Sequence, residues 1–351
     1  MRFGDALRVW RTTRRLGNAQ MTLTECPCCF QPRAELLFNV NDYSRYIFVA
    51  PSMKRSRYSL CHHCGTLFAA TRPKPDVAEA YYDLFTSTQD NAHDTYPPKS
   101  RNSRGKIATA KHVLEHLDAH GLLRPGMSVL HVRSDAGALL HELRQRIPDA
   151  AVYALDYFDP NLRWLNEQGY AAARLNSGHI EIPFSATFDV IISNHILTHA
   201  IDPRGDLERM RRALNPGGQI IFYNEIDHDF LFDHTGDLFR RADIINYHQQ
   251  LFVRESLEAL LRSAGFDHRY VGHRKERMTH LAQQSTSSSA QPVTVAPDVV
   301  ERQRRKVAQW QRIMRYRRPA ITVKHTLTWL MRPPIKGLTE NATKPPVPSS
   351  V

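Results

Sequence analysis

The five cysteines of this 351-residue chain all lie between residues 26 and 64. Four of them form two Cys-x-x-Cys pairs, Cys26 with Cys29 and Cys61 with Cys64, separated by a segment rich in strand-forming residues. A tight turn aims the two thiolates of each pair at one point, and four thiolates complete the tetrahedral shell of a zinc ion. The spacing therefore predicts a structural Zn²⁺, in preference to redox or disulfide use.

Two details of these pairs leave the ligand set open. Cys28 adjoins Cys29, so either thiol could face the metal, and the two-residue spacing selects Cys29 together with Cys26. His62 and His63 lie inside the second pair. Because four thiolates already close the shell, we expect both histidines to be exposed turn residues.

Four apolar runs further along the chain have the length and composition of buried strands, and helical patterns alternate with them. One such helix is expected over residues 107–120. This alternation indicates βαβ units and a parallel sheet covered on both faces, whose functional site lies beyond the carboxyl ends of the strands. The runs are SVLHV (128–132), AVYAL (151–155), FDVIISNH (188–195) and LNPGGQIIFYNE (214–225).

Three longer segments carry a family resemblance: FDVIISNHILTHAIDP, LERMRRALNPGG and YHQQLFVRESLEALLRSAGF. With them the chain resembles, over residues 26–284, the class I S-adenosylmethionine-dependent methyltransferases. It is similar to the small-molecule branch, including sugar C-methyltransferases, that carries a zinc-ribbon-like module before the catalytic domain. The resemblance implies an α/β Rossmann-like doubly wound sheet and S-adenosylmethionine as cofactor. It also implies methyl transfer to a small molecule, such as a sugar, a glycan precursor or a secondary metabolite.

The loop after the first strand departs from the family pattern of an acid, an apolar residue and three glycines at alternate positions. Here the sequence is His131-Val-Arg-Ser-Asp-Ala-Gly137, in which Arg133 takes the first glycine position and Gly137 alone is kept. Arg133, helped by Asp135 or Ser134, could pair with the carboxylate of the cofactor, or the loop could block the pocket. We favour pairing, because a helix N-terminus still follows; Asp135 could equally be that helix's cap.

Further cofactor contacts follow from the resemblance. Asp156 ends the second strand, where the family places an acid that accepts hydrogen bonds from both ribose hydroxyls. Tyr157 could stack on adenine or simply pack in the core. Asn176 stands where a polar side chain meets the adenine amino group. Asn194 lies at the end of the run 188–195, where polar side chains of related enzymes face the transferring methyl group.

Methyl transfer from a sulfonium needs positioning and, for neutral acceptors, removal of a proton. The candidate catalytic residues lie at or just after the ends of the runs 188–195 and 214–225, or precede the last helix: His195, His199, Glu225 and His248. Glu225 and Asp227 are placed to meet substrate, and Tyr247 with His248 resembles a segment that lines the cleft. Each of these groups could instead be a satisfied structural residue, and His199 could be a histidine that packs its helix.

The expected organisation is a basic extension (1–24), a zinc-ribbon-like module (25–85), a linker or lid (86–104), the methyltransferase domain (105–284), a linker (285–298) and a basic helical or disordered tail (299–351). The net charge of +12 belongs to the two ends, since residues 25–266 are close to neutral. In the tail, Val307, Trp310 and Met314 form one helical stripe, for which we favour docking on the main domain over binding of RNA or anionic lipid.

Neither a membrane span nor a secretory signal is expected, so we predict a cytoplasmic protein. The sequence gives no prediction of its oligomeric state. Two alternatives to a small-molecule enzyme remain. One is a catalytically degenerate relative that binds a ligand or partner, and the other is an RNA-modifying methyltransferase that uses the basic tails.

Overall fold

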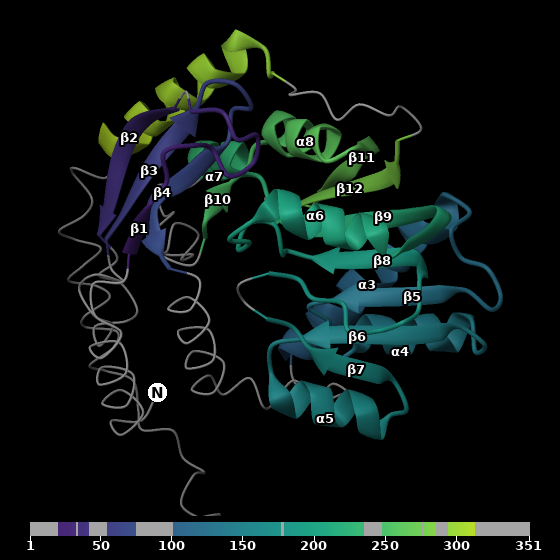
Figure 1. Ribbon diagram of the computed structural model, residues 1–351. Helices are drawn as coiled ribbons and strands as arrows, with labels where there is room; N and C mark the ends of the chain where they lie inside the picture. The colour runs from purple at the N-terminus through teal and green to yellow at the C-terminus, as the bar shows by residue number, and fades with distance from the viewer. Residues whose placement is uncertain are drawn as a thin grey trace, which may run out of the picture.

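The computed structural model describes residues 20–32, 34–41, 55–74, 101–176, 179–234, 248–274, 277–285 and 294–312. They form two sheets that lie against each other (Figure 1). The larger sheet has seven strands and the smaller has five. Tyr247, Met314 and most of the predicted linker 86–104 lie outside the described residues.

The larger sheet has the strand order β11-β12-β9-β8-β5-β6-β7. The strands β5, β6, β7, β8 and β9 are parallel to one another, whereas β12 runs antiparallel to both β9 and β11. Figure 1 shows the arrowheads of β5, β6 and β8 pointing toward the smaller sheet. The strands are β5 (Ser128–Val132), β6 (Ala151–Asp156), β7 (Ala171–Arg174), β8 (Phe188–Asn194), β9 (Leu214–Ile226), β11 (Phe266–Arg274) and β12 (Arg277–Gln284).

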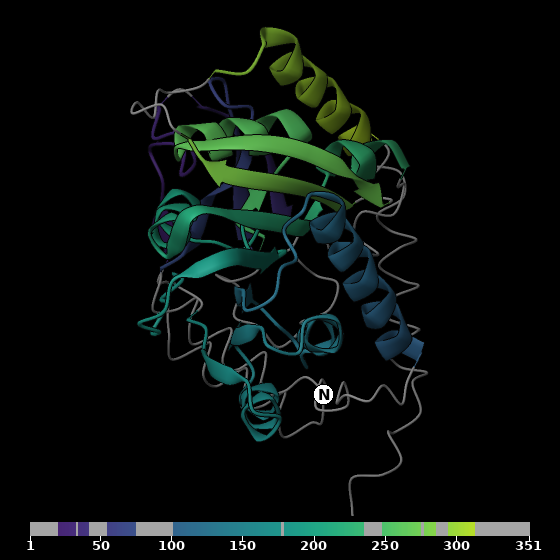
Figure 2. The same cartoon turned by 90° about the vertical axis from the view of Figure 1, so that its right-hand side faces the viewer.

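Both faces of this sheet are buried, as the continuous apolar runs predict. In β9, Ile220 and Phe222 enter one core, and the alternate residues Ile221 and Tyr223 enter the other. The first core is covered by α6 (Pro203–Arg212) and α8 (Arg254–Ser263), and the second by α3 (Arg101–Ala119), α4 (Ala138–Arg146) and α5 (Asp159–Glu167). Figure 2 shows α3 and α6 on opposite sides of the strands. The predicted α/β Rossmann-like doubly wound fold is confirmed.

The smaller sheet is antiparallel and has the order β1-β4-β3-β2, with β10 paired to β4. Its strands are β1 (Gln20–Thr22), β2 (Ala34–Asn41), β3 (Arg55–Cys61), β4 (Leu67–Pro73) and β10 (Gln250–Leu251). The sheet of the N-terminal module is therefore completed by β10, a strand of the methyltransferase domain that follows β9 and α7 in the sequence. The cysteines of the module share a continuous core with Ile196, Phe252 and Leu257.

Residues 297–312 form a helix that packs on the small sheet and on α7 (His228–His234). Val307 and Trp310 are buried there, and the Trp310 ring meets Phe38 edge-on at 5.2 Å. Docking of the predicted stripe is thus observed for Val307 and Trp310. In the part of the chain that the structure describes, no helix combines the length and the apolar character needed to cross a membrane.

One expected boundary was wrong. The helix α3 begins at Arg101, six residues before the predicted start near 107. The polar run Arg-Asn-Ser-Arg carries no apolar periodicity, so the first turn of this helix left no hydrophobic signal in the sequence.

Candidate functional site

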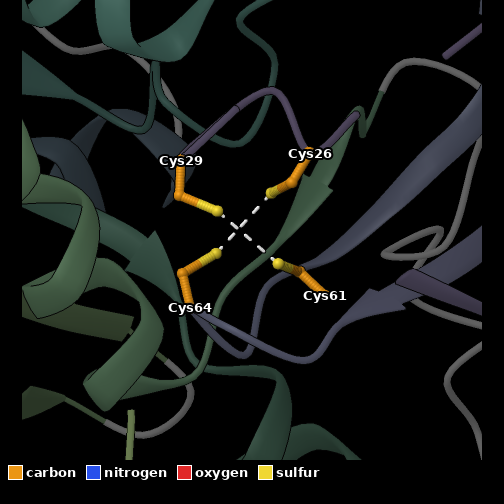
Figure 3. A group of neighbouring side chains, drawn as sticks. All are labelled: Cys26, Cys29, Cys61 and Cys64. Atoms are coloured by element: carbon orange, nitrogen blue, oxygen red, sulfur yellow. Dashed lines mark hydrogen bonds between the residues drawn. The ribbon is translucent and has the colours of Figure 1, made fainter. Parts of the chain in front are cut away.

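The N-terminal module brings four cysteines together (Figure 3). Cys26 and Cys29 come from the turn before β2, and Cys61 and Cys64 from the turn between β3 and β4. The Sγ atoms of Cys26 and Cys64 lie 3.6 Å apart, as do those of Cys29 and Cys61. Cys28 is also buried but is not part of this group, and His62 points to Glu35 and Arg304 instead.

The geometry of this cluster fits zinc. A Zn–S bond of about 2.3 Å in a tetrahedron places the sulfur atoms about 3.8 Å apart, close to the 3.6 Å separations observed. The four thiols are at most 6% exposed, and four thiolates would leave no position for a catalytic water. The donor set therefore suits a structural ion.

A buried arginine lies beside the cluster. Arg72 on β4 is 1% exposed, and it donates hydrogen bonds to three main-chain carbonyls, those of Ala69, Ile201 and Gln249. Burial lowers its pKa to about 10, and the neighbouring Cys26 and Cys28 oppose this shift, so the guanidinium is charged at neutral pH. Arg72 thereby ties β4 to two loops of the methyltransferase domain. A tetrathiolate zinc site would carry a net charge of −2, which this buried cation would compensate.

The loop after β5 keeps a left-handed backbone at alternate residues. The φ angles of Arg133, Asp135 and Gly137 are 61°, 52° and 78°. These are the three positions at which the family pattern has glycine. A Cβ atom on Gly137 would lie 2.5 Å from Leu165, which explains why this glycine cannot be replaced without a shift of the α5 side chain. The loop therefore retains a glycine-loop conformation with only one glycine.

Asp156, at the end of β6, holds this loop in place. Its Oδ2 accepts a hydrogen bond from the Asp135 amide at 2.7 Å, and its Oδ1 accepts from Phe158 N and Asn161 Nδ2 at 3.0 and 3.1 Å. Burial and the nearby Asp135 raise the pKa of Asp156 to about 7. A carboxylate offers about four acceptor positions, so three protein donors leave capacity for a ligand hydroxyl.

A chain of side-chain amides joins the carboxyl ends of β9, β8 and β5. Asn224 Nδ2 donates to Asn194 Oδ1 at 3.0 Å, and Asn194 Nδ2 donates to the carbonyl of Arg133 at 3.1 Å. The guanidinium of Arg133 reaches back to the carbonyl of His195 at 2.9 Å. The predicted pair Arg133 and Asn194 is thus brought together at the strand ends.

Three predicted histidines converge next to Arg133. His195 follows β8, His199 lies four residues further on, and His248 precedes β10; all three are less than 10% exposed. One ring nitrogen of each lies within 4.8 Å of the others. Burial, followed by His199 and Arg133, depresses the pKa of His195 well below its usual range. The His195 ring is therefore neutral at physiological pH.

Glu225 lies under this cluster and is fully buried. Its Oε1 accepts hydrogen bonds from the amides of Ile196 and Leu197, and its Oε2 accepts from the Thr198 hydroxyl at 3.0 Å. The Oε2 atom also lies 3.9 Å from Nδ1 of His195. Burial raises the pKa of Glu225, while the hydrogen bonds from this turn oppose the rise. Glu225 therefore shapes the turn that carries His195 and His199.

The remaining predicted residues are engaged within the protein. Tyr157 is half-buried and packs against the core, and burial raises the pKa of its hydroxyl. Asn176 donates to Glu181 at 3.2 Å. Asp227 accepts a hydrogen bond from His273 Nε2 at 2.8 Å.

Sequence reasoning missed the residues that connect the two sheets. The Tyr58 hydroxyl donates to the carbonyl of His248 at 2.6 Å, and the Ala69 amide donates to the carbonyl of Gln249 at 2.8 Å. On the other side of this segment, the amides of Gln249 and Gln250 both donate to the Thr198 carbonyl. The N-terminal module thereby positions His248 opposite His199. Single polar residues in short strands form no sequence pattern from which these contacts between the two sheets could be predicted.

Comparison with known families gives the class of this protein. A family described as a methyltransferase domain matches residues 69–271, more than half of the chain. The chain belongs to this family and is an S-adenosylmethionine-dependent methyltransferase. No curated protein was found to match its sequence.

Solved structures with a similar fold include three methyltransferases. A chain of the complex between the Haloferax volcanii Trm112 methyltransferase activator and its methyltransferase is 13% identical, with 58% of this chain and 97% of that chain covered and a TM-score of 0.42. A methyltransferase from Aquifex aeolicus is 20% identical, covering 50% and 88%, with a TM-score of 0.39. Magnesium protoporphyrin IX methyltransferase from Synechocystis is 14% identical, covering 60% and 100%, with a TM-score of 0.44.

Proposed function

We propose that the protein methylates a small molecule with S-adenosylmethionine, and that the three buried histidines face the acceptor. The burial of His195, His199 and His248 carries this proposal, because none of them exceeds 9% exposure. A nucleobase of an RNA or a side chain of a protein substrate would have to be extruded from its own fold to reach the three histidines. A small acceptor can be enclosed.

The charge distribution supports the same acceptor class. Three of the five basic residues of the helix 297–312 are engaged in ion pairs: Arg302 pairs with Asp229 and Glu255, Arg304 with Glu35, and Lys306 with Asp233. A nucleic-acid surface requires such cations to be available to phosphates. This part of the predicted tail therefore favours a role in packing over RNA binding.

For the cofactor, the residues present fit the donor that the family uses. S-adenosylmethionine supplies an activated methyl group on a sulfonium. We infer that Asp156 accepts a hydrogen bond from a ribose hydroxyl, and that the backbone around Gly137 lies along the methionine portion. The Arg133 guanidinium, held at the ends of β5 and β8, would pair with the methionine carboxylate. Tyr157 and Asn176 stay as candidates for the adenine side.

For the proton, the candidate acceptors are His195, His199, His248 and Glu225. Glu225 is committed to three hydrogen bonds from residues 196–198, so we assign it a positioning role. The imidazoles are the groups that would meet an acceptor hydroxyl.

Transfer of a labelled methyl group tests the acceptor class. The protein is incubated with methyl-tritiated S-adenosylmethionine and, separately, with the small-molecule, RNA and protein fractions of a cell extract. We expect label in the small-molecule fraction. Asp156→Asn should lower the incorporation about 10- to 100-fold, because it removes a charge-assisted acceptor.

Two controls make the result decisive. Thermal unfolding must show that Asp156→Asn is folded, and calorimetry with S-adenosylhomocysteine must show that its binding is weakened. Label in RNA or protein alone would overturn the small-molecule proposal. No binding of S-adenosylhomocysteine by the folded wild-type protein would favour a binding protein without activity.

A further inference from the structure

We propose that His195, His199 and His248 bind a divalent transition-metal ion, distinct from the cysteine site, beside the methyl-transfer centre. The proposal deepens the proposed function, because an open position on this ion is available to an oxygen atom of the acceptor. Three protein ligands with one open position are typical of catalytic rather than structural metal sites. Imidazole nitrogen suits Zn²⁺, Fe²⁺, Ni²⁺ and Cu²⁺.

The first argument is convergence. One ring nitrogen from each histidine falls within 4.8 Å of the other two. In a tetrahedral zinc site with Zn–N bonds of about 2.0–2.1 Å, these nitrogens would be about 3.4 Å apart. Small rotations of the rings close the difference. The pairs His195–His199 and His199–His248 already have ring centroids 4.7 Å apart, and the ring planes are steeply inclined, which lets the nitrogens point at a common centre without stacking.

The second argument is an orphan polar atom. Nδ1 of His195 is fully buried and has no hydrogen-bond partner. A buried polar atom without a partner costs about 1–3 kcal/mol. A metal ion held by this nitrogen would remove the cost.

The third argument is charge and support around the cluster. The Glu225 carboxylate lies 3.9 Å from Nδ1 of His195 and supplies the buried negative charge that a cation needs. The neighbouring cation, Arg133, directs its guanidinium to the carbonyl of His195. The hydrogen bonds that Glu225 accepts from residues 196–198 hold the turn between His195 and His199, and so help to fix the relative positions of these two ligands.

The fourth argument is preorganisation. His195 adopts a left-handed backbone, with φ at 49°, which turns its side chain out of the strand direction. Tyr58 fixes the carbonyl of His248, and the Gln249 amide binds Thr198, next to His199. The ligand-bearing segments are therefore tied to each other independently of any ion, as a designed metal site requires.

Metal analysis of the full-length protein tests the proposal. A second histidine pair must first be removed, because His112 and His116 lie four residues apart on α3 with ring nitrogens 3.1 Å apart, and such a pair can bind metal adventitiously. In the His112→Gln, His116→Gln background, protein equilibrated with Zn²⁺ and then desalted should contain two zinc ions per chain. Adding His199→Ala or His248→Ala should reduce this to one.

Three further variants separate metal binding from folding. His280→Asn changes another fully buried histidine, on β12, and should keep two ions. His248→Cys restores a ligand and should recover the second ion. Glu225→Gln keeps the shape of its side chain and should weaken the second site about 10- to 100-fold. Circular dichroism confirms that each variant is folded.

Cobalt identifies the ligands directly. The cysteine site filled with Co²⁺ should give intense thiolate-to-metal charge-transfer bands, and the histidine site should add only weaker visible bands that disappear in His199→Ala. One zinc per chain in the background protein, or a second ion that persists in both alanine variants, would overturn the proposal. Neither measurement uses a methyl acceptor, so failure here leaves the small-molecule proposal standing, and the reverse also holds.

Discussion

At the scale of single residues, the loop 133–137 after β5 keeps the backbone conformation of a glycine loop although only Gly137 is a glycine. Arg133 and Asp135 have φ angles of 61° and 52°. A left-handed residue with a side chain costs about 1–2 kcal/mol, and Asp156 and Asn194 hold the loop through hydrogen bonds that oppose this cost. A side chain retained in so unfavourable a conformation is a candidate for function.

Replacing Arg133 by glycine tests this idea. Glycine adopts a positive φ readily, so Arg133→Gly should leave the free energy of unfolding within about 1 kcal/mol of wild type. If the guanidinium pairs with the methionine carboxylate, affinity for S-adenosylhomocysteine should fall about 10- to 100-fold. Thermal unfolding and isothermal calorimetry measure the two quantities.

Methylthioadenosine provides the matched ligand for this variant. It keeps the adenosine and the sulfur but lacks the amino-acid portion, so its affinity should be the same for Arg133→Gly and wild type. An equal loss for both ligands would mean that Arg133 shapes the loop and does not meet the carboxylate.

At the scale of elements, the two sheets are joined by a short strand that could not be predicted. β10 contains only Gln250 and Leu251, yet it pairs with Phe68 and Leu67 of β4. Two residues cannot show an alternating pattern. In contrast, the bounds of β5 agree with the sequence prediction, because all of its residues after Ser128 are buried and form one apolar run. The strand-end position of Asp156 followed from the same kind of run.

Zinc removal should therefore disturb the methyltransferase domain. When a chelator removes the metal from the four cysteines, hydrogen exchange should accelerate at the amides of Gln249 and Gln250, which donate to Thr198. The reason is that β4 then no longer anchors β10. Mass spectrometry with local resolution measures this change.

The control for zinc removal lies in the central strand β5, whose amides should exchange at the same rate with and without the metal. Tyr58→Phe should accelerate exchange at the same segment about 5-fold while keeping zinc, since one hydrogen bond is worth about 1 kcal/mol. Unchanged exchange at Gln249 after metal loss would contradict the coupling of the two sheets.

The contacts between the small sheet and residues 248–251 explain which part of the site could be predicted from the sequence. His195 and His199 are four residues apart, and their proximity follows from local spacing. His248 joins them because Tyr58, Ala69 and Arg72 hold its segment. These contacts cross more than 170 positions of the chain, and no local pattern encodes them. The three histidines were therefore predicted one by one, and their convergence was not.

At the scale of the whole molecule, the basic helix 297–312 stabilises the assembly of the two sheets. Trp310 is 5% exposed and lies between Phe38 of the small sheet and Phe232 of α7, with ring centroids 5.2 and 6.0 Å away. Gln303 reaches the carbonyl of Gly65 in the second cysteine turn. The helix thus covers an apolar core that the small sheet shares with Leu251 of β10.

Truncating its anchor should lower stability substantially. Trp310→Ala removes a buried aromatic side chain and should reduce the free energy of unfolding by about 3 kcal/mol. Arg305→Ala, an exposed position on the same helix, should change it by less than about 0.5 kcal/mol. Denaturant unfolding measures both, and equal effects of the two substitutions would contradict the packing role.

The pairing of β10 with β4 also bears on how the chain is made. A ribosome releases β4 long before it releases Gln250 and Leu251, so during synthesis the nascent cysteine module carries a bare strand edge that can recruit other chains. Early capture of the metal would hold the turns in shape during that interval. In zinc-depleted cells, this protein should consequently accumulate as aggregates that form during translation.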